Sequence, residues 1–97
     1  MRIITKAAIR EYSLNHASAK EALNEWYVRA KAADWGSLAD IKEDFGSVDY
    51  VGNDNYVFNI KGNNYRLIVR IIFDIHTIYI RFIGTHAEYN KINASTA

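Results

Sequence analysis

The stretch Tyr56–Tyr89, YVFNIKGNNYRLIVRIIFDIHTIYIRFIGTHAEY, decides the fold of this chain. Runs of alternating apolar and polar residues separated by turn residues predict three antiparallel strands that lead into a short helix. We place the first turn at Gly62-Asn63, because glycine and asparagine tolerate positive φ angles. This turn sets Asn59 opposite Arg66.

The second turn of this stretch is placed at Ile75-His76, which sets Arg70 directly opposite Arg81. The same pairing sets Val69 opposite Phe82 and Ile71 opposite Ile80. Side chains alternate between the two faces of a strand, so each pairing assigns every residue to a face. Both hairpins give the same assignment, which supports the register.

One face of the predicted sheet is apolar and the other is basic. The apolar face comprises Tyr56, Phe58, Ile60, Tyr65, Leu67, Val69, Ile71, Phe73, Ile78, Ile80 and Phe82. The basic face comprises Asn59, Lys61, Arg66, Arg70, Tyr79 and Arg81, with Val57, Ile68, Ile72 and Ile83 among them.

The basic face has a charge pattern that folding alone does not require. A like-charged pair directly across two strands destabilises a sheet by about a few tenths of a kcal/mol, and no acidic residue lies among the cations on these strands. Clustered cations kept at such a cost indicate an anionic ligand. Ordinary solvated positions on a sheet with one wet face explain the same pattern equally well.

The composition limits the classes of protein. With 97 residues and 49% hydrophobic content, the chain is expected to form one domain, residues 1–97, with one core. There is no cysteine, which excludes disulfides and thiolate metal sites. The histidines His16, His76 and His86 are not at metal-ligand spacing, and no metal or cofactor is expected. His16 and His76 are predicted to lie in loops and receive no role.

No apolar run is long enough for a membrane span and no signal peptide is recognisable, so a cytoplasmic location is expected. The net charge of +1 is unevenly distributed. Residues 1–54 carry seven Lys/Arg and nine Asp/Glu, and residues 55–97 carry five and two, giving −2 and +3. The positive charge therefore belongs to the sheet, which favours a local anion site over a uniformly basic surface.

The N-terminal half is predicted to be mainly helical, which makes the fold class α+β: a small antiparallel sheet packed on two to three N-terminal helices, with a short C-terminal helix. The expected elements are a strand over Met1–Thr5, a helix capped by Thr5 and ending near Asn15, a helix opened by a Ser18/Glu21 capping box and ending near Asp34, a short helix over Ser37–Gly46, and a strand over Ser47–Val51.

The C-terminal helix is predicted to begin with a capping box formed by Thr85 and Glu88. This places His86 in the first turn and Tyr89 on the same side, just after the strand that carries Arg81. Helix N-termini attract anions, and histidine or tyrosine side chains transfer protons, so these are the groups that cleavage of a phosphodiester needs. The simpler interpretation of His86 is a polar residue that only shapes the first turn.

Two motifs in this stretch resemble a known family. The run V57-F-N-I-K-G-N-N-Y-R-L-I-V-R70, followed by Y79-I-R-F-I-G-T-H-A-E-Y89, is similar to the HigB family of type II toxins, within the RelE-like superfamily of mRNA interferases. The resemblance is strongest over residues 55–92 and extends more loosely to the N-terminus. Each motif alone is weakly specific, and the two together identify the family.

The resemblance implies a RelE-like fold and an endoribonuclease that cuts mRNA, commonly in the ribosomal A site, without a metal. In this family the ribose 2′-hydroxyl attacks the adjacent phosphate and leaves a 2′,3′-cyclic phosphate and a 5′-hydroxyl. The implied partners are mRNA, the ribosome and a HigA-like helix-turn-helix antitoxin that neutralises the toxin.

The resemblance also implies roles for individual residues. The predicted catalytic residues are Arg66 and Arg81 at the scissile phosphate, His86 as general acid or base, and Tyr89 as proton donor or base-stacking ring. The predicted RNA-binding residues are Lys61, Arg70 and Asn59. Some RelE-like toxins use a C-terminal Asp-Tyr-His group, which this chain lacks in its final residues NKINASTA, so the proton-transfer roles are less firmly carried over than the phosphate contacts.

Two other functional classes remain open. The basic face would equally serve a protein that binds RNA or the ribosome without cutting, or a module that receives an acidic partner segment. The isoleucines Ile68, Ile72 and Ile83 on that face either pack beneath the C-terminal helix or mark where an antitoxin docks.

Overall fold

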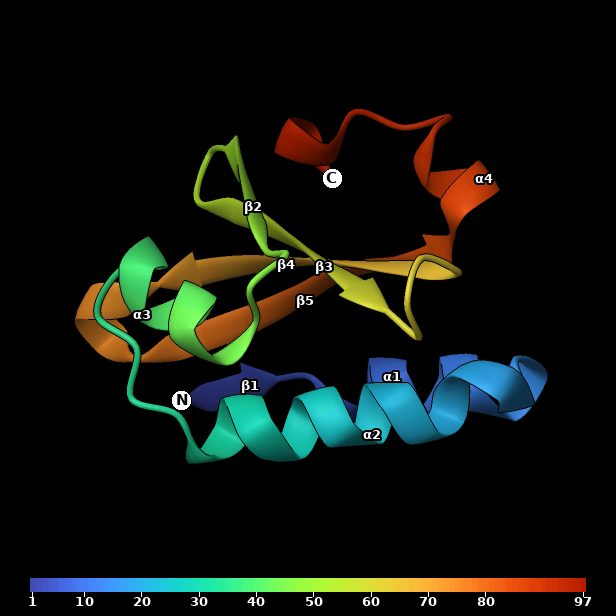
Figure 1. The fold of residues 1–97 in the computed structure, drawn as a ribbon, viewed down its shortest axis with the longest axis horizontal. Helices are drawn as coiled ribbons and strands as arrows, with labels where there is room; N and C mark the ends of the chain where they lie inside the picture. Colours follow the sequence, from blue (N-terminus) through green and yellow to red (C-terminus); the bar gives the residue numbers. More distant parts are fainter.

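The computed structural model describes all 97 residues and contains one five-stranded sheet in the order β1-β5-β4-β3-β2 (Figure 1). The elements in chain order are β1 (Arg2–Ile4), α1 (Lys6–Asn15), α2 (Ala17–Ala32), α3 (Leu38–Asp44), β2 (Asp49–Gly52), β3 (Asn55–Ile60), β4 (Tyr65–Ile72), the 3₁₀ turn η1 (Phe73–Ile75), β5 (Thr77–Thr85), α4 (His86–Tyr89) and the 3₁₀ turn η2 (Ala94–Thr96). The α+β class and the order of elements are confirmed.

The sheet is mixed. Neighbouring strands from β2 to β5 are antiparallel, whereas β1 pairs parallel to β5. The β1–β5 pairing ends at Ile4 opposite Tyr79, and β5 continues to Thr85. The later part of β5 therefore has a strand on only one side.

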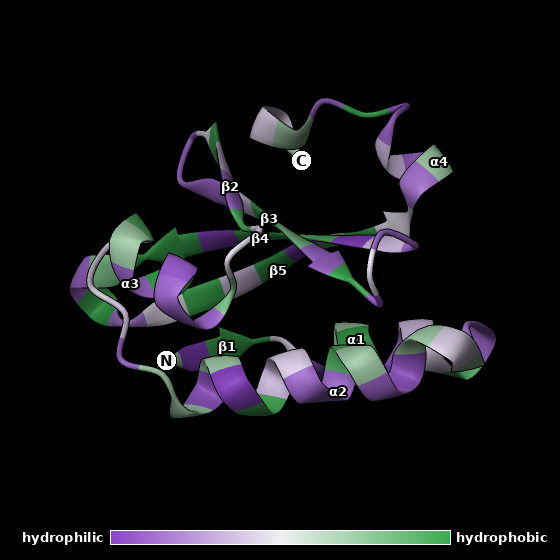
Figure 2. Cartoon of the chain, viewed as in Figure 1, coloured by the Kyte–Doolittle hydropathy of each residue, from purple (hydrophilic) through white to green (hydrophobic).

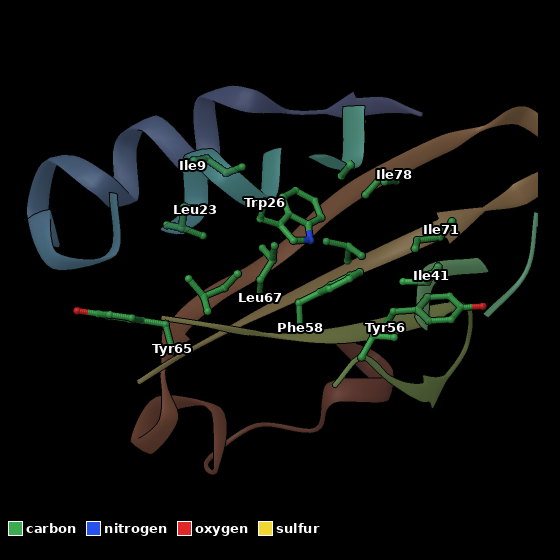
Figure 3. Close-up of a cluster of buried hydrophobic side chains, with 14 of the residues drawn as sticks. Ile9, Leu23, Trp26, Ile41, Tyr56, Phe58, Tyr65, Leu67, Ile71 and Ile78 are labelled. Carbon is green, nitrogen blue, oxygen red and sulfur yellow. The ribbon is translucent and has the colours of Figure 1, made fainter. Parts of the chain in front are cut away.

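Helices α1 and α2 cover one face of the sheet and enclose the core with it (Figures 1 and 3). Leu23, Trp26 and Ala30 recur at helical spacing on α2 and are all buried. Phe58 of β3 contacts the Trp26 ring edge-on, with ring centroids 5.4 Å apart. Figure 2 shows the apolar residues concentrated along the central strands. The aromatic stripe of α2 is therefore core packing, because its spacing directs it toward the sheet.

The first hairpin has the predicted register. Asn59 lies opposite Arg66, and Phe58 opposite Leu67. The connection is closed by the amide of Asn64, which donates to the Lys61 carbonyl over 3.2 Å. The positive φ angles fall on Lys61 and Gly62, at 52° and 64°. The predicted turn position is correct, but the second left-handed residue is Lys61 and not the expected Asn63.

The predicted register of the second hairpin is wrong. The chain reverses through η1, and His76 adopts a left-handed conformation at its end, with φ of 49°. Arg70 therefore lies opposite Tyr79 and not Arg81. Val69 pairs with Ile80, and Ile71 with Ile78. The like-charged pair inferred from sequence does not exist as a direct cross-strand pair.

A β-bulge at Arg81 reduces the error in the predicted register from two residues to one for the rest of β5. Val69 lies opposite Ile80 but Ile68 lies opposite Phe82, which leaves Arg81 as the extra residue. Phe82 therefore joins the basic face instead of the apolar face. Ile83, which the sequence assigned to the basic face, lies on the apolar face and packs against the core.

The predicted helix caps have mixed outcomes. Thr85 and Glu88 form the complete capping box. Ser37 caps α3 by accepting from the Asp40 amide. Thr5 stands before α1 without a capping bond. The predicted Ser18/Glu21 box is wrong, because α2 begins at Ala17 and the Ser18 hydroxyl bonds the Tyr65 hydroxyl instead. None of the helices has both the length and the apolar character needed to cross a membrane.

Candidate functional site

The second face of the sheet lies beneath the C-terminal segment, which leaves α4 and arches back across the strands (Figure 1). Val57 and Ile68 on this face are buried, at 3% and 0% exposed. Ile72 is half-buried. Because Ile68 is enclosed and Ile83 belongs to the core side, these isoleucines do not form a continuous exposed docking patch.

Arg70 and Arg81 line one pocket of about 250 Å³ on this face, together with Asn53, Asn55 and residues 95–97. Both arginines are exposed. The bulge is what directs Arg81 here, since the extra residue in a strand is re-aimed relative to its neighbours. The two cations inferred from sequence therefore converge, although they are not paired across the strands.

The C-terminal segment already supplies acceptors to this pocket. The Nε of Arg81 donates to the backbone oxygen of Ala97 over 3.1 Å. The buried Asn55 side chain donates to the carbonyl of Ala94 over 2.9 Å, and Asn53 donates to that of Ser95 over 2.8 Å. The sequence contained no signal for this arrangement, because it joins positions about forty residues apart.

Arg70 has an acidic neighbour that the strand pattern did not include. Its Nη2 lies 3.8 Å from the carboxylate of Asp54, and both side chains are about half exposed. Asp54 belongs to the turn before β3 and has a φ of 63°. An exposed pair at this distance contributes little to stability, so Arg70 stays available to a stronger anionic ligand.

Arg66 is a different kind of arginine, because only 8% of it is exposed. Its guanidinium donates to the carbonyl of Asn63 over 3.1 Å, to the side-chain oxygen of Asn63 over 2.7 Å and to the carbonyl of Tyr65 over 3.2 Å. It also lies 5.7 Å from the centroid of the Tyr89 ring. Arg66 therefore fixes the β3–β4 turn and supports α4. Asn59, its cross-strand neighbour, is exposed.

Helix α4 presents His86 to solvent, and three amides at its start are hydrogen-bonded within the protein. The Thr85 amide donates to Glu88 over 2.8 Å, the Glu88 amide to Thr85 over 3.2 Å, and the His86 amide to the Asn64 carbonyl over 3.1 Å. These bonds from Thr85 hold the pKa of Glu88 below its ordinary value. These bonds occupy the amides of Thr85, His86 and Glu88.

The predicted site residues form two groups on one face. The strand register runs from Arg66 opposite Gly84, through Ile68 opposite Phe82, to Arg70 opposite Tyr79. His86 and Tyr89 lie at the Arg66 end, where exposed Lys61 occupies the adjacent turn. Arg81 belongs to the bulge between the two ends. It shares the pocket with Arg70.

His16 has structural contacts that its predicted loop position did not reveal. Its ring stacks on Tyr12, with centroids 3.9 Å apart and planes 3° from parallel. Tyr65 meets Tyr12 edge-on at 6.1 Å. Burial raises the pKa of Tyr12, and the charge of Glu88 acts in the same direction. The first helix therefore contributes a rigid aromatic cluster beside α4.

Comparison with known proteins gives concordant matches. Residues 19–92 match the model of the HigB toxin family, described as the RelE-like toxic component of a toxin–antitoxin system. The mRNA interferase HigB of Escherichia coli O6:H1 (strain CFT073) is 31% identical over 94 residues, which cover 95% of this chain and 91% of that protein. The mRNA interferase toxin HigB of Escherichia coli K12 is 28% identical over 97 residues, covering 97% and 92%. The chain belongs to the HigB toxin family.

Proposed function

We propose that this chain is an mRNA interferase, an endoribonuclease that inhibits translation by cutting mRNA. The observation that carries the proposal is the convergence of Arg70 and Arg81 in one pocket lined by two exposed arginines. Two convergent cations match the charge of an RNA phosphate. Membership of a toxin family whose relatives are named mRNA interferases supports the same activity.

The reaction is a transesterification within RNA that needs no metal. The 2′-oxygen attacks the adjacent phosphorus, and the bond from phosphorus to the 5′-oxygen breaks. The products are a 2′,3′-cyclic phosphate and a 5′-hydroxyl. One group takes the 2′ proton and another donates a proton to the leaving oxygen, while cations offset the charge that develops on the phosphate.

Each predicted residue has a place in this scheme. Arg81 contacts the scissile phosphate, and His86 transfers a proton as general acid or base. Arg70 binds an adjoining phosphate, and Lys61 and Asn59 extend RNA binding toward the β3–β4 turn. Tyr89 donates a proton or stacks on a base. Arg66 acts as a positioning residue, because its guanidinium is buried and its hydrogen bonds go to Asn63 and Tyr65.

Binding of RNA at Arg81 requires the final residues to move. The backbone oxygen of Ala97 accepts the bond that a phosphate oxygen would accept. A phosphate forms charge-assisted, bidentate bonds with a guanidinium, whereas the Ala97 oxygen makes a single contact with the Nε of Arg81. RNA therefore competes favourably for this position.

The family also supports two finer proposals. The toxin acts on mRNA in the ribosomal A site, and a HigA-like helix-turn-helix antitoxin neutralises it. Co-expression with a neighbouring gene for such a protein should restore growth and yield a stable complex. Growth arrest that persists despite an equimolar complex would argue against neutralisation by that partner.

The chemistry is tested with an RNA that the toxin cuts and a copy with one 2′-deoxyribose at the cut position. With both RNAs bound to ribosomes, the wild-type protein should cut the first, leave a cyclic phosphate and spare the second. His86→Ala should lose cutting, while His76→Ala, another exposed histidine far from α4 in the chain, should not. Cutting of the deoxy-substituted RNA would rule out the mechanism. Retained RNA binding without any cleavage would favour the non-cleaving alternative.

A further inference from the structure

A second groove borders Arg81, on the side away from the arginine pocket. It has a volume of about 360 Å³ and lies between α1 and β5. Helix α1 contributes Glu11, Tyr12 and Asn15, and β5 contributes Ile80, Arg81 and Phe82. This part of β5 lies beyond the end of the β1 pairing at Tyr79, so its outer edge has no neighbouring strand.

Arg81 lines both this groove and the pocket that holds Arg70. A ligand bound to the Arg81 guanidinium through an anionic group therefore has a groove with both apolar and polar walls directly beside it. RNA has this combination of parts, because each phosphate is joined through a ribose to a flat, largely apolar base. The two cavities together match a phosphate and its neighbouring base.

We propose that the α1–β5 groove is a nucleobase subsite, and that it determines which base the toxin prefers next to the phosphate held by Arg81. This inference rests on the proposed RNA cleavage and deepens it by assigning the origin of sequence preference. Neither the predicted catalytic residues nor the predicted RNA-binding residues, Arg81 excepted, lie in this groove.

The walls of the groove have the chemistry that base binding needs. Tyr12 of α1 provides aromatic surface on which a base can stack, and Ile80 and Ile83 of β5 add aliphatic surface. Tyr12 is held in place, since His16 stacks on it at 3.9 Å and Tyr65 contacts its edge at 6.1 Å. A preorganised wall lowers the entropic cost of binding.

The rim of the groove supplies groups that distinguish bases. Asn15 carries both a donor and an acceptor, the arrangement that pairs with adenine through two hydrogen bonds. Glu11 carries acceptors that suit the amino group of cytosine. Both side chains are exposed on α1 and engage in no side-chain hydrogen bond or ion pair within the protein. They are therefore free to select the base.

The alternative occupant of an open strand edge is an added strand from a partner protein. The local structure disfavours this, because the bulge interrupts the regular spacing of backbone groups and places a cation at the edge. Bulges and charged residues are the devices that block strand addition at sheet edges. A base needs only one or two of the edge groups and is unaffected by the irregularity.

The test is a map of cut sites across a long transcript, read by sequencing of the 5′-hydroxyl ends. Asn15→Ala and Glu11→Gln should change the base frequencies beside the cut by about tenfold, within the range of a side chain–base contact. Total cleavage should fall much less than in Arg81→Ala. Asn24→Ala is the matched control, since Asn24 is an exposed asparagine on α2 that lines a separate groove.

Unchanged base frequencies in both groove variants would overturn the proposal. The proposal would also be overturned by groove variants that cut RNA with unchanged base frequencies but are no longer neutralised by the antitoxin, because the groove would then be the antitoxin-binding surface. If the wild-type protein cuts no RNA, that result contradicts the proposed function and not the base subsite. The subsite is then judged by adding the four nucleoside monophosphates to isotope-labelled protein. Base-dependent shifts of the Asn15 side-chain amide and residues 80–83 would support it, and their absence would refute it.

Discussion

The Nε of Arg81 donates a hydrogen bond to the backbone oxygen of Ala97 over 3.1 Å, so the strand bulge and the end of the described chain meet in the arginine pocket. Asn55, which is 3% exposed, anchors the same segment through Ala94. The segment thus stabilises the face it covers and competes with any anion there. Both effects are measurable separately.

Deletion of residues 94–97 should tighten RNA binding and lower stability. The Arg81 guanidinium is freed, while the buried Asn55 amide loses its protein partner at a cost of about 1–3 kcal/mol. RNA affinity is measured by fluorescence anisotropy with a deoxy-substituted, uncleavable RNA, and stability by urea unfolding. Lys91→Ala, an exposed change outside the pocket, is the control. Weaker RNA binding by the shortened protein would contradict competition by the tail.

Arg81→Ala should reduce cleavage much more than Lys61→Ala. Loss of a group that stabilises charge in the transition state costs about 2.7–4 kcal/mol, or roughly 10²–10³ in rate, whereas Lys61 occupies a solvent-exposed turn. Single-turnover cleavage rates provide the comparison. Both variants should unfold within about 0.5 kcal/mol of the wild type. A folded Arg81→Ala protein with normal rates would remove Arg81 from the reaction.

Arg66→Ala should destabilise the protein, in contrast to Arg70→Ala. Arg66 is 8% exposed and its three hydrogen bonds hold the β3–β4 turn. Removal deletes three hydrogen bonds from a charged donor, one of them to the carbonyl of the buried Tyr65, at about 1–3 kcal/mol. Arg70 is the matched control because it lies on the same strand with an exposed side chain. Equal urea midpoints for the two variants would show that the Arg66 contacts are dispensable.

Gly84→Ala should strain the protein through Phe82. A Cβ atom at Gly84 would overlap the tip of the Phe82 ring, so that one of the two would have to move. Overpacking of this kind costs about 1–3 kcal/mol. In the double variant with Phe82→Ala, the Gly84→Ala change should cost less than it does alone. Additive unfolding free energies in this cycle would show that the two residues do not interact.

Acid should loosen α4 through Glu88. The folded-state pKa of Glu88 is lowered by its hydrogen bonds from Thr85, so the box contributes stability above about pH 4.5 and loses it as the pH falls through that lowered pKa. The amide signal of Thr85, followed by NMR between pH 7 and 2.5, should report the loss. In Glu88→Gln the amide side chain still accepts a bond, so the signal should stay constant. A wild-type signal insensitive to acid would contradict the box.

The sequence predicted the features that depend on neighbouring residues. The Gly62 turn fixed the first hairpin, and the spacing of Thr85 and Glu88 produced the capping box. The second hairpin failed because Phe73–Ile75 has no glycine, proline or asparagine to mark a 3₁₀ turn. Near that turn the error in register is two residues, which leaves the assignment of faces intact.

Beyond the bulge at Arg81 the remaining error is one residue, which exchanges the faces of Phe82 and Ile83. For this reason the sequence could not predict the groove beside α1, because the shape of the groove depends on which face of the sheet carries Phe82. The contact between Arg81 and Ala97 could not be predicted from the sequence either, because no local sequence pattern links these two residues. The sequence shows which residues are cations, but only the folded structure shows which of them lie together.

Primer extension on a reporter mRNA tests the central claim most directly. Purified protein is incubated with the message, with and without translating ribosomes, beside Arg81→Ala and His86→Ala. We predict cuts that require ribosomes and that both variants lose. Cuts in free mRNA would retain the nuclease and discard the A-site mechanism. A folded wild-type protein that leaves the message intact in both conditions would contradict the account and leave the basic face as a binding surface.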